Sequence, residues 1–229
     1  PHGVTGHIVP WNYPMQIIGR SVGDALAMGN AAVLKPAEEA CLTALAFGDL
    51  ALEAGLPAGA LNIVPGLGRE AGAALAGHSG VQHISFTGSV ATGVAVQAAA
   101  AQNLVPVTLE LGGKSPQLVF DDADLDAALP FLVNAGVQNA GQTCSAASRI
   151  LVQRGVYDRV AEAMAARYRA LRVGPAAHDL DIGPLISARQ RDIVQGFLGQ
   201  TAPEHELARA AMAADLPPGG FYFAPRLLA

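Results

Sequence analysis

The sequence of 229 residues is poor in cysteine, in charge and in long hydrophobic runs, and each shortage excludes a class of protein. Its two cysteines, Cys41 and Cys144, are too few for a disulfide framework, so we expect a reducing compartment, the cytoplasm. No apolar run reaches the roughly 18 residues of a membrane span. Lys and Arg number 14 against 19 Asp and Glu, and this net charge of −5 argues against nucleic acid or an anionic membrane as a partner.

Short metal and nucleotide signatures are also missing. The six histidines show no H-E-x-x-H spacing, so we expect no metal site and disfavour a metal hydrolase. The glycine-rich stretch Gly66–Gly72 has one residue too many for the dinucleotide fingerprint G-x-G-x-x-G. Hydrophobic residues nevertheless make up 51% of the chain, which is typical of a globular protein with a real core.

The chain does contain short apolar or β-branched runs that alternate with longer Ala- and Leu-rich stretches. This alternation predicts βαβ units, an α/β fold and a doubly wound parallel sheet. We predict strands at 4–9, 31–34, 61–64, 83–86 and 105–109. Helices are predicted at 14–28 and 40–54, in a stretch ending near 76, and from Gly88-Ser89 to about 101.

The alternation restarts after the glycine pair 112–113, which we take as a domain boundary. We therefore predict two domains, 1–111 and 112–229, with strands at 116–120 and 148–153 and helices at 124–138, 156–171 and 187–200. The chain begins in a strand-like segment at Pro1, and Phe221–Ala229 resembles a strand stopped midway. We expect both domains to be truncated, in an internal piece of a longer protein.

Cys144 is the better candidate nucleophile of the two cysteines. Cys41 lies in an apolar helical pattern, where a small buried hydrophobe is expected. Cys144 lies in the polar loop 141–145, and a helix opening from that loop would favour the reactive thiolate through its backbone N–H groups.

Two further polar residues stand at predicted strand ends. Glu110 follows the strand predicted at 105–109, at the edge where open α/β sheets hold their ligands, although an ion pair with Lys114 would also explain it. Asn12, in a loop bounded by Pro10 and Pro14, is able to donate from its amide, although an Asx turn would also explain it.

A second group of residues suits a nucleotide. Glu38 follows the second predicted strand and is able to accept hydrogen bonds from ribose hydroxyls, with Lys35 donating to the same sugar; the alternative is a surface ion pair of little worth. Gly88 and Ser89 begin a helix whose N–H groups attract a pyrophosphate. Gly93, one turn further on, permits close packing.

Four separated stretches carry these residues: Pro10-Trp-Asn-Tyr-Pro14, Lys35-Pro-Ala-Glu38, Phe86–Gly93 with Glu110-Leu-Gly-Gly-Lys114, and Gly141-Gln-Thr-Cys144. In order and in spacing they resemble the aldehyde dehydrogenase family. The resemblance runs from the first residue to about Leu185, and more weakly through Phe221–Leu228. The chain departs from the family at Pro225-Arg226, where a Pro-Thr pair is usual.

The resemblance implies a Rossmann-like NAD-binding domain at 1–111 and a catalytic domain at 112–229. It makes Cys144 the nucleophile that forms a thiohemiacetal, Asn12 and the Cys144 N–H the oxyanion hole, and Glu110 the base that activates the hydrolytic water. The residues it assigns to the cofactor are Trp11, Lys35, Glu38, Gly68, Gly88, Ser89, Gly93 and Leu111. NAD is the expected cofactor, because the carboxylate of Glu38 would repel the 2′-phosphate of NADP. NADP stays possible, since family members with this glutamate use both.

The resemblance further implies a small aldehyde as substrate and a homo-oligomer for the whole protein. Two alternatives stay open at this point. One is a CoA-acylating semialdehyde dehydrogenase, whose family members commonly lack the base at the position of Glu110. The other is a catalytically inactive nucleotide-binding fragment, which would have no need for Cys144, Asn12 and Glu110 together.

Overall fold

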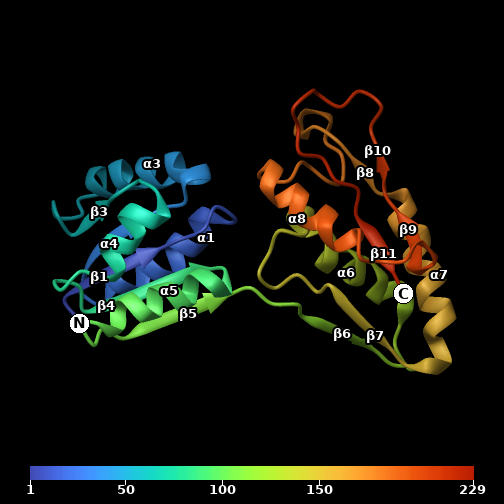
Figure 1. Ribbon diagram of the computed structural model, residues 1–229, viewed down its shortest axis with the longest axis horizontal. Helices are drawn as coiled ribbons and strands as arrows, with labels where there is room; N and C mark the ends of the chain where they lie inside the picture. The colour runs from blue at the N-terminus through green and yellow to red at the C-terminus, as the bar shows by residue number, and fades with distance from the viewer. The chain divides into compact units, whose positions relative to one another are not determined.

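The computed structural model describes all residues from Pro1 to Ala229, and the chain divides into two compact units, Pro1–Gly112 and Gly113–Ala229 (Figure 1). Each unit has its own hydrophobic core. No helix in either unit combines the length and the hydrophobicity that crossing a bilayer requires.

The first unit is built on a five-stranded parallel sheet. Its strands are β1 (Val4–Ile8), β2 (Ala31–Lys35), β3 (Leu61–Ile63), β4 (His83–Gly88) and β5 (Val107–Leu111). They lie in the order β3-β2-β1-β4-β5, and every neighbouring pair is parallel. The order reverses at β1, so the chain winds outward on both sides of this strand. The predicted doubly wound α/β sheet is confirmed.

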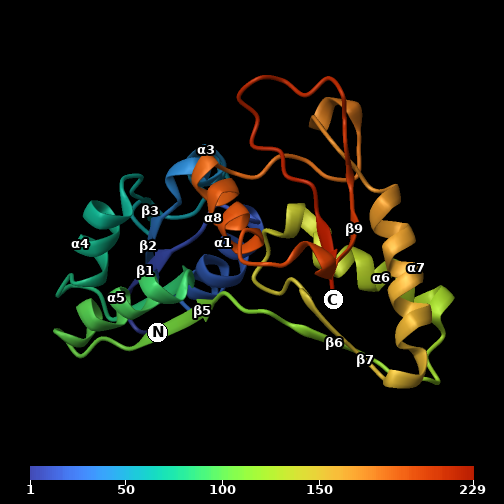
Figure 2. The same cartoon turned by 45° about the vertical axis from the view of Figure 1, so that its right-hand side comes forward.

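Helices cover both faces of this sheet. They are α1 (Pro14–Ile18), the π-helical turn η1 (Gly19–Gly23), α2 (Asp24–Ala27), the 3-10 turn η2 (Glu38–Ala40), α3 (Cys41–Glu53), the π-helical turn η3 (Gly68–Gly72), α4 (Ala73–Ala76) and α5 (Val90–Ala101). Ile18 and Ala44, from α1 and α3, pack with Leu34 on one face. Residues of α4 and α5 pack with Ile84 on the other, and both Figures 1 and 2 show α5 lying along β4 and β5.

Strand β5 begins later than predicted. Pro106 has no N–H to donate to a ladder, and the N–H of Val105 bonds instead to the carbonyl of Ala100 at the end of α5. The strand therefore runs from Val107 to Leu111 rather than 105–109, and Glu110 lies within it, opposite Thr87 of β4.

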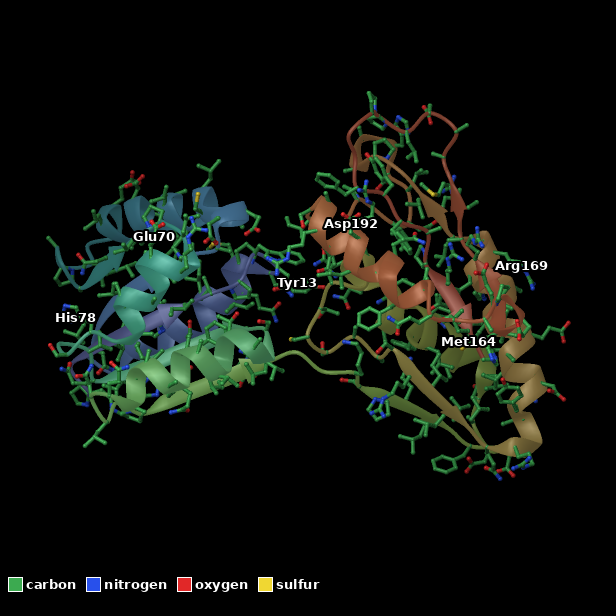
Figure 3. All side chains as sticks on the ribbon, viewed as in Figure 1. Tyr13, Glu70, His78, Met164, Arg169 and Asp192 are labelled. Carbon is green, nitrogen blue, oxygen red and sulfur yellow. The ribbon has the colours of Figure 1, made fainter.

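The second unit packs helices against three short strand pairs. Its elements are β6 (Pro116–Val119), α6 (Leu125–Val137), η4 (Gln138–Gly141), β7 (Arg149–Val152), η5 (Arg154–Val156), α7 (Tyr157–Ala170), β8 (Arg172–Val173), η6 (Ala176–His178), α8 (Ala188–Leu198), η7 (Pro203–His205), β9 (Glu206–Arg209), β10 (Ala211–Met212) and β11 (Arg226–Leu228). Strands β6–β7 and β8–β10 pair in parallel, whereas β9–β11 is antiparallel. Buried residues of α6 and α7, among them Met164 (Figure 3), form its core.

The sequence patterns did not reveal β8, β9 and β10, which have at most four residues each and therefore no readable alternation. The strand expected over Phe221–Ala229 is confined to Arg226–Leu228.

The buried imidazole of His7 makes the stability of the first unit pH-dependent. Burial, and secondarily the charge of His83, lowers the pKa of His7 from 6.5 to about 4. Between pH 6.5 and 4 the imidazole of His7 is protonated in the unfolded chain but neutral in the folded chain. The free energy of unfolding therefore decreases as the pH falls through this range. We expect this loss to total about 2–3 kcal/mol.

Urea unfolding followed by the fluorescence of Trp11, the single tryptophan, measures this loss at pH 7, 5 and 4. His7→Gln should reduce the pH dependence in that window, whereas the exposed control His205→Gln should keep it. An unchanged slope in His7→Gln would contradict the assignment.

Candidate active site

The predicted site residues of the first unit stand at one edge of its sheet. Asn12 follows β1, Lys35 ends β2, Ser89 follows β4, and Glu110 lies one residue before the end of β5. Because all five strands are parallel, these positions meet at the carboxyl edge. In open α/β sheets ligands bind outside this edge, at the point where the strand order reverses, which here lies between β1 and β4.

The loop that carries Trp11 and Asn12 is a tight bend between β1 and α1, and both side chains are half-buried. Tyr13 has a left-handed backbone, with φ 52°, and its carbonyl accepts the N–H of Ile17 to start α1. Pro14 occupies the first helical position, where a missing N–H costs nothing. The backbone at Asn12 is therefore held between a strand end and a helix start.

Glu110 forms an ion pair that the sequence did not suggest. Its Oε2 lies 3.9 Å from Nη2 of Arg20, and both side chains are more than half exposed. Arg20 comes from the π-helical turn η1, a kind of irregularity that is frequent at functional sites. The predicted alternative partner, Lys114, instead donates to the carbonyl of Gly113. An exposed pair of this kind contributes roughly 0–1 kcal/mol, so Glu110 is held loosely.

Lys35 and Gly68 both contact the carboxylate of Glu38. Oε1 of Glu38 accepts the N–H of Gly68 at 2.6 Å, and its Oε2 lies 3.2 Å from Nζ of Lys35. Desolvation opposes ionisation of Glu38, but backbone N–H groups and the Lys35 ammonium outweigh it and hold the pKa of Glu38 below its ordinary value. The ion pair of the alternative interpretation is therefore present, but only its Glu38 side is at the surface, because the side chain of Lys35 is 3% exposed and that of Glu38 40%.

The start of α5 has the structure that the sequence predicted. Ser89 is its N-cap, with Oγ accepting the N–H of Thr92. The other N–H groups of a first helical turn have no acceptor within the helix and suit an anion. A Cβ at Gly88 would lie 2.6 Å from the ring of Phe86, and one at Gly93 would lie 2.7 Å from Cδ2 of Leu111. Both glycines thus permit close packing beneath this helix start.

The exposed thiol of Cys144 belongs to the second unit, where it stands in a turn closed by the N–H of Ala146 and the carbonyl of Thr143. No helix opens from this loop, so that expectation is wrong; the loop pairs with existing elements, and the strand predicted at 148–153 follows as β7 from Arg149. The N–H of Ala147, for example, bonds to the carbonyl of Ala135 in α6. Cys41, expected to be buried, is half-buried at the first residue of α3.

An unusual backbone leads into the Cys144 turn. Asn139, Ala140 and Gly141 are successively left-handed, with φ of 52°, 56° and 76°. Two side chains hold this segment: Nδ2 of Asn139 donates to the carbonyl of Gln142, and Oε1 of Gln142 accepts the N–H of Ile186. A left-handed alanine is strained, and such strain clusters at functional sites. Sequence reasoning named Gly141 and Gln142 as part of the Cys144 loop but missed Asn139, Ala140 and Arg20, since no local pattern signals them.

Comparison with known proteins decides the family. The sequence model of the aldehyde dehydrogenase family matches residues 1–229, the entire chain. The chain belongs to the aldehyde dehydrogenase family. No group of three or more His, Cys, Asp or Glu side chains in the structure is placed to hold a metal ion.

Individual aldehyde dehydrogenases agree with this assignment. The chain is 43% identical over 227 residues to hydroxyisobutyraldehyde dehydrogenase of Mycolicibacterium austroafricanum, covering 98% of this chain and 45% of that protein. It is 49% identical over 199 residues to the mitochondrial succinate-semialdehyde dehydrogenase of Arabidopsis thaliana, covering 86% and 38%. The chain thus spans less than half the length of these relatives.

Solved structures extend the agreement to the fold. A Burkholderia cenocepacia protein described as an aldehyde dehydrogenase superposes with a TM-score of 0.97 at 64% identity, covering 100% of this chain and 48% of that one. Betaine aldehyde dehydrogenase from Staphylococcus aureus, solved in complex with NAD+, superposes with a TM-score of 0.90 at 36% identity, covering 99% and 46%.

Proposed function

We propose that the whole protein oxidises an aldehyde to a carboxylic acid with NAD as hydride acceptor. The observation that carries this proposal is the row of polar groups at the carboxyl edge of the parallel sheet, from Asn12 after β1 to Glu110 near the end of β5. Family membership supports it, and so does the NAD+ complex of the Staphylococcus aureus relative.

In this proposal the chemistry begins at Cys144. Its thiolate adds to the aldehyde carbon, and the negative charge that develops on the oxygen is stabilised by the amide of Asn12 and the N–H of Cys144. NAD, when bound, would accept the hydride whose loss converts the thiohemiacetal into a thioester. Glu110 then takes a proton from water, the water oxygen attacks the thioester carbon, and the sulfur leaves as the thiolate.

The structure offers a fitting cradle for the cofactor. The carboxylate of Glu38 would accept from the adenosine ribose and Lys35 would donate to it, while Gly68 lines the same place. The first turn of α5, beginning at Ser89, would hold the pyrophosphate. Trp11, Gly88, Gly93 and Leu111 complete the proposed set.

Replacing Glu38 tests this cradle directly. We expect Glu38→Gln to raise the dissociation constant of NAD about 10- to 100-fold, because a charged acceptor is lost, and to improve the relative affinity for NADP. The adjacent exposed Glu39→Gln is the matched control and should bind NAD normally. Calorimetric titration of the whole protein measures both. Equal affinity in the two variants would remove Glu38 from the site.

One second candidate is a CoA-acylating dehydrogenase. NADH formation by the whole protein, with a panel of aldehydes and with or without CoA, separates the two. Turnover without CoA supports the hydrolytic enzyme that the presence of Glu110 favours. Turnover only with CoA supports the acylating one, and NAD binding without turnover supports an inactive nucleotide-binding protein.

Homo-oligomerisation and a cytoplasmic location stay predictions for the whole protein. Light scattering after size-exclusion chromatography tests the first, and subcellular fractionation tests the second.

A further inference from the structure

A cavity of about 420 Å³ lies within the second unit, between α8 and the antiparallel strands β9 and β11. Three guanidinium-bearing residues from three different elements line it: Arg191 of α8, Arg209 of β9 and Arg226 of β11. Asp192, which Figure 3 labels on α8, is the one carboxylate in the lining, and Tyr222 adds an aromatic wall. None of these residues belongs to the proposed catalytic or NAD-binding set.

The two strands place like charges against each other. Arg209 and Arg226 are direct partners in the β9–β11 register, an arrangement that is destabilising by itself. A single carboxylate, Glu206, bridges them: its Oε1 accepts Nε of Arg209 at 2.9 Å, and its Oε2 accepts Nη1 of Arg226 at 2.5 Å. Hydrogen bonds from Arg209, and then from Arg226, outweigh desolvation and keep the pKa of Glu206 below its ordinary value. One positive charge remains uncompensated.

Arg226 also keeps an unused donor. The side chain is 23% exposed, and its Nε is buried and has no hydrogen-bond acceptor among the 229 residues. Buried charged donors without an acceptor are rare and costly. On the opposite wall Arg191 bonds the Oδ1 of Asp192 and lies over the ring of Phe221. Three guanidiniums therefore line the cavity, and the carboxylates paired with them are Asp192 in the lining and Glu206 outside it.

We propose that this cavity binds the phosphoryl group of a small molecule. Planar guanidinium forks bind phosphate oxygens in pairs, and an oxyanion in this cavity would offset the excess positive charge of the three arginines. The cavity is larger than a phosphate, so space remains beside Tyr222 for the organic part of the ligand.

The test is calorimetric titration of the whole protein with inorganic phosphate, with potassium chloride holding the ionic strength constant. We expect saturable binding that Arg226→Thr weakens about tenfold or more, because a charged donor is lost. Arg191→Gln, in α8, should weaken it as well and guards against a folding defect in the first variant. Arg172→Thr is the matched control, since Arg172 pairs with Asp181 elsewhere in the same unit, and it should bind normally.

Three results would overturn the proposal. The first is the absence of any binding heat at constant ionic strength, which would show that phosphate acts only by screening charge. The second is unchanged affinity in both Arg226→Thr and Arg191→Gln. The third is acetate binding as tightly as phosphate, which would replace the phosphoryl group by a carboxylate. Because the readout is binding and not turnover, none of these results bears on the proposed dehydrogenase activity.

Discussion

Cys144→Ala should abolish NADH formation by the whole protein, with a loss of at least about 10⁴-fold in kcat, and should abolish esterase activity as well. Both activities need a sulfur that forms a covalent adduct, and no other exposed thiol exists in this chain. The dissociation constant of NAD should stay unchanged, since the proposed cradle lies in the other unit. Steady-state NADH absorbance and calorimetry measure the two quantities.

Cys41→Ala is the matched control for this experiment. Cys41 is half-buried at the start of α3, so its loss should leave kcat at the wild-type value. Turnover that persists in Cys144→Ala and disappears in Cys41→Ala would reverse the assignment of the nucleophile.

Glu110→Gln should separate the two halves of the reaction. We expect the first turnover to release NADH at nearly the normal rate, because attack and hydride transfer do not need a base for water. Steady-state turnover should fall about 10²- to 10⁴-fold, because a glutamine is unable to take the proton from the hydrolytic water. Rapid mixing resolves the initial burst from the steady state.

Glu70→Gln is a suitable control for Glu110→Gln. Glu70 (Figure 3) is likewise an exposed carboxylate beside an arginine, with Oε1 3.5 Å from Nε of Arg69. It should leave both phases unchanged. If Glu110→Gln instead kept full steady-state turnover in the presence of CoA, the acylating reaction would be the better description.

Helix starts in both units, and the strands of the first unit, were predictable because their signals are local. Ser89, Asp124 and Ser187 stand at three predicted helix starts, and in each case the side chain accepts a backbone N–H of the first turn. The parallel, doubly wound sheet followed from the alternation of strands with helices, and with it the gathering of Asn12 and Glu110 at one edge. The strand order itself was not predicted.

Features that depend on distant residues were not predictable. The burial of Lys35 and its pairing geometry depend on how β2 packs, not on the Lys-Pro-Ala-Glu sequence. Pairing of β9 with β11 joins residues about twenty positions apart through strands too short to show a period. The π-helical turn that carries Arg20 has no sequence signature either. The roles of the site residues stay predictions until the variants above are measured.

The left-handed run Asn139–Gly141 also bears on the order in which the protein opens. Backbone in this region costs about 1–2 kcal/mol per non-glycine residue, and a few hydrogen bonds of Asn139 and Gln142 offset it, with only the partly buried Ala140 packed against the core. Local opening free energies are lowest where contacts are few. Amide exchange should therefore be fast around Cys144 while α6 and α7 remain protected, so that the reactive thiol samples several positions without any cost to the core.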